Sequence, residues 1–125
     1  MPLTLAPVAS SVRVGRRWVL DQAATAGVQQ PAMPTIELLT SEVLTNAIVH
    51  GSQGHPVVLH TCLNDDLFGV AVTDQSPDQP RRLQPAPTAG GGRGVLLVDL
   101  LATDWGCQAL DPSGKSVWFL LSVRT

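Results

Sequence analysis

The chain has 125 residues, which is enough for one hydrophobic core and too few for two. With 44% hydrophobic residues and a formal net charge of −2, it lacks the basic excess expected of a nucleic-acid-binding protein. No apolar run approaches the roughly 20 residues of a membrane helix, and the N-terminus has no basic segment followed by an apolar run. We therefore expect a single cytoplasmic domain without a membrane anchor.

The cysteines and histidines are not spaced as metal ligands. Cys62 and Cys107 lie in apolar, strand-like surroundings without a Cys-x-x-Cys motif, which predicts buried, reduced thiols. His50, His55 and His60 fall at a helix end, in a glycine-rich connection and within a strand, so they lack the paired spacing of structural zinc. Neither a disulfide nor a zinc ion is expected.

The first quarter of the chain predicts a short edge strand at residues 3–5 and then a helix beginning near Pro7. Gly27 marks the end of this helix. Small and apolar residues recur along it at three- and four-residue steps: Val8, Val12, Gly15, Val19, Ala23 and Ala26. Three arginines lie off this stripe, at 13, 16 and 17. They form either a solvated face or a docking patch for an acidic partner.

A second helix is predicted from the N-cap residue Thr35 to His50, after a connection with two prolines. One stripe of this helix is apolar and predicts its buried side: Ile36, Leu39, Val43 and Ala47. Glu42, Asn46 and His50, spaced four apart, form a second stripe along its flank. Together, a carboxylate, an amide and an imidazole at the edge of an apolar surface can serve as base, metal ligand and positioner. Any one of them taken alone would ordinarily be just a solvated side chain, and it is the set in this order that indicates a site.

The second half of the chain is rich in strand patterns. Residues 57–63 and 67–73 predict an antiparallel hairpin around residues 64–66. Residues 102–106 and 114–123 predict two further strands around a turn. The tryptophans of these last strands, Trp105 and Trp118, are expected in the core.

Asp74 ends a predicted buried strand, where a carboxylate must accept hydrogen bonds. It either caps the following turn or accepts a hydrogen bond from a ligand such as an adenine amine.

Residues 75–92 are predicted to form a long loop rich in Pro, Gln and Gly, which is either mobile or functional. The glycine run at 90–94 precedes an apolar segment at 95–101 that predicts a helix, and such a helix start can approach phosphate closely. The run is neither a Walker A nor a Rossmann motif.

Three motifs in order carry a resemblance to the GHKL, or histidine-kinase-like, ATPases. Glu42-x-x-x-Asn46-Ala47-x-x-His50-Gly51 resembles their N box, Val72-Thr-Asp74-Gln-Ser76-Pro77 their G1 box, and Gly90-Gly-Gly-Arg-Gly94 their G2 box. Within this superfamily the chain is most similar to the anti-sigma-factor serine/threonine kinase branch, including small actinobacterial ATP-binding regulators. Histidine kinases commonly have glycines after the G1 aspartate, whereas the serine and proline found here are frequent in the anti-sigma branch. The resemblance extends from about Pro7 to the end.

The resemblance implies an α/β fold, a two-layer α+β sandwich of the Bergerat type. Residues 1–125 would form one domain, with three helices on one face of a mixed, mostly antiparallel sheet. Residues 75–92 would be the ATP lid, and ATP would lie between the helices and this lid.

The resemblance also implies a role for each matching residue. Glu42 is the expected catalytic residue, which activates the hydroxyl of a protein serine, and Asn46 is the expected Mg²⁺ ligand. Asp74 is expected to accept a hydrogen bond from the adenine amine. The other expected ATP-binding residues are His50 in support, Gly90, Gly91, Gly92, Arg93 and Gly94 around the phosphates, and Ser116 near the adenine. From its strand position alone, Ser116 is equally an ordinary residue facing solvent.

The partners implied by the resemblance are a sigma factor, which is bound directly, and an anti-anti-sigma protein, which is phosphorylated on serine. No direct nucleic-acid contact is implied, and a homodimer is left open because family members commonly dimerise. Two other classes stay open: a non-catalytic ATP-dependent switch, and an interaction module that has lost nucleotide binding. Asn46, Asp74 and the glycine run argue against the second of these.

Overall fold

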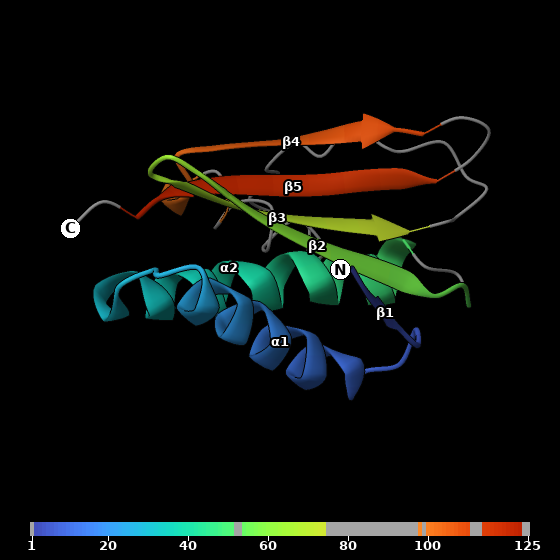
Figure 1. Cartoon of the computed structure of the whole chain (residues 1–125). Coiled ribbons are helices and arrows are strands. Elements are labelled where there is room, and N and C mark those ends of the chain that lie inside the picture. Colours follow the sequence, from blue (N-terminus) through green and yellow to red (C-terminus); the bar gives the residue numbers. More distant parts are fainter. Residues whose placement is uncertain (1, 52–53, 75–97, 99, 111–113, 124–125) are drawn as a thin grey trace.

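The computed structural model describes residues 2–51, 54–74, 98, 100–110 and 114–123, and of residues 50 and 51 it describes the backbone only. Helices α1 (Ser11–Thr25) and α2 (Met33–Asn46) form one layer, and a five-stranded sheet forms the other (Figure 1). The strands are β1 (Leu3–Leu5), β2 (Val57–Asn64), β3 (Leu67–Asp74), β4 (Asp104–Ala109) and β5 (Lys115–Ser122), in the order β1-β2-β3-β5-β4. This confirms the predicted two-layer α+β fold. All four pairings between these strands are antiparallel, so the parallel component that we expected is not found among them.

Helix α1 confirms the middle of the predicted apolar stripe but not its ends, because Val8 and Ala26 are exposed, and the helix begins later than expected. Gly15, Val19 and Ala23 are buried on its inner side. Residues 6–10 form bends and turns instead of helix, and the backbone N–H of Val8 donates to the carbonyl of Ala6. Gly27 follows the helix with a φ of 94°, a left-handed conformation that glycine adopts without strain.

Gly15 is a point of close contact between α1 and the rest of the molecule. A Cβ atom at this position would lie 2.9 Å from the Cδ1 atoms of both Leu5 and Leu59, and closer still to Leu44. These leucines come from β1, β2 and α2 and are all buried. The missing side chain therefore lets α1 pack directly onto both layers.

Helix α2 differs from its prediction at both ends. A 3₁₀ turn at Gln30–Ala32 leads into it, and it begins at Met33 with Pro34 in its first turn, where the missing proline N–H costs no hydrogen bond. The α-helix ends at Asn46 and continues as a π-helical turn, Ala47–Gly51, instead of running as α-helix to residue 50. Its predicted buried stripe is confirmed, because the four apolar side chains are at most 5% exposed: Ile36, Leu39, Val43 and Ala47.

The predicted hairpin is confirmed as β2 and β3. Asn64 pairs with Leu67, and Asp65 adopts a φ of 56° in the two-residue turn between them. Strands β4 and β5 also pair as predicted. A further helical segment is represented by Val98, Leu100 and Leu101, of which Val98 is buried.

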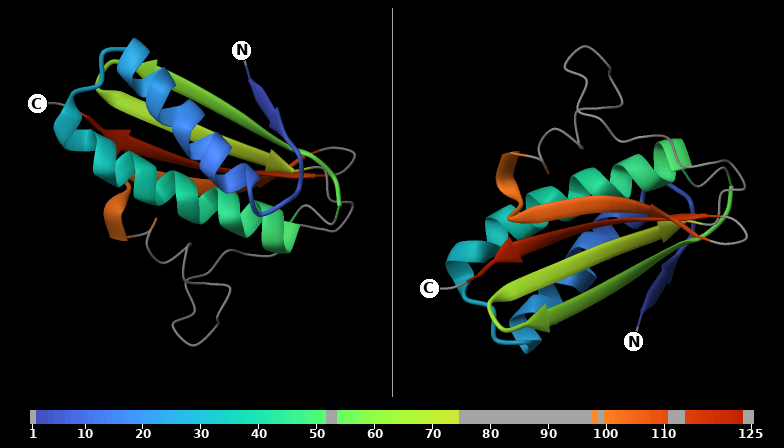
Figure 2. Two further views of the ribbon diagram at one scale, coloured as in Figure 1. Left: turned by 90° about the horizontal axis from the view of Figure 1, so that it is seen from below. Right: turned by 90° about the horizontal axis from the view of Figure 1, so that it is seen from above.

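The two faces of the sheet have different surroundings (Figure 2). Alternate side chains of β2, β3 and β5 face the helices and form the core: Val57, Leu59, Phe68, Val70, Val72 and Phe119. No described helix covers the outer face, which corrects two predictions. Cys62 is exposed there instead of buried, and Trp118 is half-buried with its indole against Gly106. A predominantly apolar strand does not reveal which of its faces is covered.

Candidate functional site

Helix α2 has two flanks with different neighbours. On one flank, the Nε atom of Arg16 lies 3.5 Å from Oε2 of Glu37, and its Nη1 donates to Oγ of Ser41 at 3.3 Å, so this flank is joined to α1. At about 100° per residue, Glu42 and Asn46 lie on the opposite flank. Both side chains are half-buried and one turn apart. The predicted carboxylate and amide are therefore at the edge of the core, on the side of α2 that faces away from α1.

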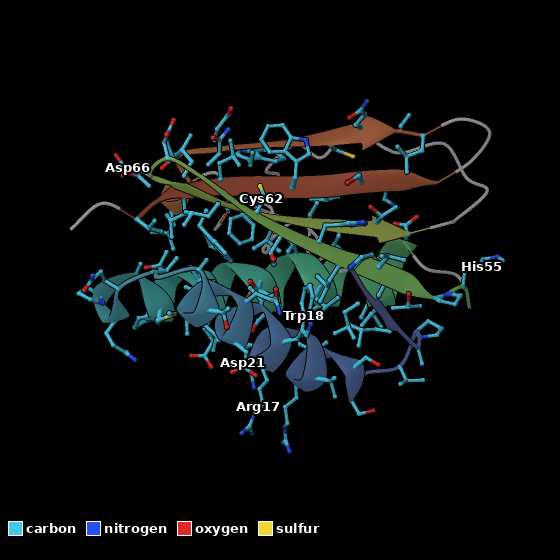
Figure 3. All side chains as sticks on the ribbon, viewed as in Figure 1. Arg17, Trp18, Asp21, His55, Cys62 and Asp66 are labelled. Carbon is cyan, nitrogen blue, oxygen red and sulfur yellow. The ribbon has the colours of Figure 1, made fainter. Side chains whose placement is uncertain are left out.

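The arginines of α1 do not form one continuous patch. Arg16 contacts α2, whereas Arg13 and Arg17 are exposed. Figure 3 shows the side chains of Arg17 and Asp21 pointing away from the sheet. Arg16 therefore links the two helices, and a docking role for the other two arginines stays a prediction.

Asp74 is buried at the end of β3 and is paired with a lysine that the sequence analysis did not single out. Its side chain is 2% exposed, and its Oδ2 lies 2.7 Å from Nζ of Lys115. The two residues are directly opposite each other in the β3–β5 register. The ammonium group offsets the cost of burying the carboxylate charge. The signal in the sequence that could have indicated this partner is that Lys115 is the only lysine of the chain and stands at the start of a predicted strand.

Ser116 lies on the other face of the sheet from Asp74. It pairs with Thr73, and Oγ1 of Thr73 donates to its Oγ at 3.3 Å. Because successive side chains of a strand point to opposite faces, Lys115 is the residue that β5 brings to the carboxylate. A contact between Ser116 and adenine stays a prediction.

The structure brings the end of α2 and the end of β3 to the same end of the molecule (Figure 1). The π-helical turn Ala47–Gly51, which directly follows Asn46, contacts β3. The backbone of His50 belongs to this turn, and its side chain is outside the described part of the structure. Asn46 and Asp74 are therefore placed at one end of the sandwich, although they come from different layers.

Cys107 on β4 belongs to the surroundings of the ion pair. It pairs with Val117 and is half-buried, which corrects the prediction that its thiol is fully buried. Burial raises the pKa of its thiol, the positive charge of Lys115 opposes this, and the negative charge of Asp74 adds to it. The thiol is therefore mostly protonated at neutral pH and a weak nucleophile.

A shallow hollow of about 160 Å³ lies on the outer face of the sheet, between Cys62, Ala71 and Trp118. These side chains alternate with the core residues of their strands, so the hollow is on the opposite side from Asp74. It is separate from the end of the molecule where α2 and β3 meet.

Comparison with known proteins identifies the family. A family model described as the histidine kinase-like ATPase domain matches residues 5–121, which include both helices and Glu42, Asn46 and Asp74. The chain is a histidine kinase-like ATPase domain. No curated protein matches the chain. Membership in this family implies ATP binding and, in general, ATP-dependent chemistry.

A histidine kinase-like ATPase domain must accommodate the phosphates of ATP, and part of the expected set lies outside the described residues. This applies to the proposed lid at 75–92 and to Gly90, Gly91, Gly92, Arg93 and Gly94. Among the residues that are described, no group of three or more His, Cys, Asp or Glu side chains could hold a metal ion. Magnesium needs no such cage, because it usually binds one or two protein oxygens together with phosphates and water.

One further property of this ATPase domain concerns membranes. Across the described residues, no helix has both the length and the apolar character required to span a bilayer.

Proposed function

We propose that this histidine kinase-like ATPase domain is an anti-sigma-factor-type serine/threonine protein kinase of the cytoplasm. It binds Mg·ATP where α2 and β3 meet, binds a sigma factor, and phosphorylates a serine of an anti-anti-sigma protein. The observation that carries the proposal is the placement of Glu42 and Asn46 on the flank of α2 that faces away from α1, with Asp74 buried at the same end of the molecule.

Each of these side chains has one task in the proposed reaction. Asn46 offers its amide oxygen to Mg²⁺, which offsets the phosphate charge when it is bound. Asp74 accepts a hydrogen bond from the exocyclic amine of the base. Glu42 accepts the proton of the serine hydroxyl. At the same time the serine oxygen forms a bond to the γ-phosphorus, and the bond between this phosphorus and the ADP oxygen breaks. The half-buried position of Glu42 allows contact with both the core and a bound substrate.

Glu42→Ala tests the catalytic part of the proposal. With radiolabelled ATP and candidate anti-anti-sigma proteins, wild type should label a serine of one candidate, and Glu42→Ala should label it at least about 100-fold more slowly. Glu37→Ala is the matched control, since it removes a carboxylate from the opposite flank of the same helix and should keep most of the activity. ATP binding without label on any candidate would favour the non-catalytic switch.

Asn46→Ala tests the metal site without any partner. We expect Mg·ATP to bind at least about 10-fold more weakly, because the shortened side chain no longer reaches the metal. The unfolding midpoint should hardly change, since Asn46 lies on the flank of α2 and alanine favours helix. Calorimetric titration measures the affinity, and Thr45→Ala on the neighbouring exposed position is the control. Unchanged affinity in Asn46→Ala would show that the metal is held elsewhere.

A further inference from the structure

Lys115 is the more accessible member of the buried ion pair. Its side chain is 15% exposed, whereas that of Asp74 is 2% exposed. Of the two side chains, that of Lys115 therefore offers more surface to a ligand that approaches the pair. An ammonium group has three N–H donors, and the 2.7 Å contact with Oδ2 of Asp74 accounts for one of them.

The two charged groups form a donor beside an acceptor, and the edge of adenine has the complementary arrangement. Its exocyclic amine donates hydrogen bonds, and the neighbouring ring atom N1 accepts one. If the amine binds Asp74 with the N1 side of the ring toward Lys115, the ammonium group can donate to N1. Guanine has the reverse order, with an acceptor at the exocyclic position and a donor at N1.

We propose that Lys115 is a second base-recognition residue, whose ammonium group donates a hydrogen bond to purine N1 while Asp74 accepts from the amine. This inference rests on the proposed nucleotide site. It extends that site from a single carboxylate to an ion pair that reads two neighbouring atoms of the base. It also places Lys115 in direct contact with the ligand, in addition to its contact with Asp74.

The alternative is that Lys115 only compensates the charge of Asp74. The two roles are separated by 1-deaza-ATP, an analogue in which N1 is replaced by C–H while the amine is kept. If Lys115 only holds Asp74, its removal weakens ATP and 1-deaza-ATP by the same factor. If it donates to N1, its removal affects ATP alone.

The experiment measures the dissociation constants of ATP and 1-deaza-ATP for wild type and Lys115→Met. In wild type, we expect 1-deaza-ATP to bind at least about 10-fold more weakly than ATP, as for loss of a charge-assisted hydrogen bond. In Lys115→Met, the dissociation constants of the two ligands should lie within about 2-fold of each other. The four dissociation constants form a double-mutant cycle that measures the coupling between Lys115 and N1. Equal preference for ATP in both proteins would overturn the inference. Absence of ATP binding to wild type would instead refute the proposed nucleotide site.

Arg17→Met is the matched control, because it makes a similar change at an exposed position of α1. It should keep the wild-type preference for ATP over 1-deaza-ATP. If Lys115→Met does not fold, wild type still provides the test, since Lys115 is the only lysine and ¹⁵N-lysine labelling gives one side-chain resonance. ATP should shift this resonance clearly more than 1-deaza-ATP does. Equal shifts would overturn the inference.

Discussion

Asp74→Asn is expected to weaken ATP binding about 10- to 100-fold and to lower the free energy of unfolding by about 3 kcal/mol. Asparagine keeps the shape of the side chain but provides a neutral acceptor, so the charge-assisted hydrogen bond to the adenine amine is lost. The loss of stability has a different origin, because Lys115, with a side chain only 15% exposed, would remain without its carboxylate. Nucleotide titration and denaturant unfolding measure the two effects separately.

The double variant Asp74→Asn/Lys115→Met distinguishes loss of affinity from loss of fold. Because it removes both charges, it should recover most of the stability that Asp74→Asn loses. Its ATP affinity should stay low. Wild-type affinity in a folded Asp74→Asn protein would contradict the role of this carboxylate in base binding.

Gly15→Val is expected to lower the free energy of unfolding by about 3 kcal/mol through overpacking. The new side chain would collide with Leu5, Leu44 and Leu59, which are at most 6% exposed and belong to the packed core. These leucines belong to β1, α2 and β2, so the collision is relieved only if α1 moves away from all three and its buried contacts are loosened. Denaturant unfolding followed by circular dichroism measures the change.

Ala24→Val is the control for this substitution. It introduces the same side chain at an exposed position of the same helix, where we expect a change of no more than about 0.5 kcal/mol. Equal effects of the two substitutions would contradict the packing role of Gly15, because valine has a higher helix propensity than glycine and a lower one than alanine.

Local patterns were sufficient to predict most elements of this fold. Four apolar residues of α2 repeat with helical spacing, and all four are buried. The β2–β3 hairpin was readable because residues 64–66 interrupt two strand-like runs, and Asp65 tolerates the positive φ of the turn. The spacing of Glu42 and Asn46 likewise placed both on the half-buried flank of α2.

The errors arose where distant parts of the chain determine the outcome. The contact between Asp74 and Lys115 depends on the register of β3 and β5, which are separated by a long connection, and no local pattern gives that register. The exposure of Cys62 depends on which face of the sheet the helices cover. The π-helical turn after Asn46 changes the spacing of the helix without a proline or glycine at its start.

The contacts of α2 limit how the proposed kinase can be controlled. Arg16 links one side of α2 to α1, and the apolar stripe of α2 is buried in the core. Rotation of α2 would therefore expose its buried apolar residues, so Glu42 and Asn46 are expected to keep their positions. Active and inactive states of the proposed kinase would then differ in which ligand or protein segment contacts these two side chains.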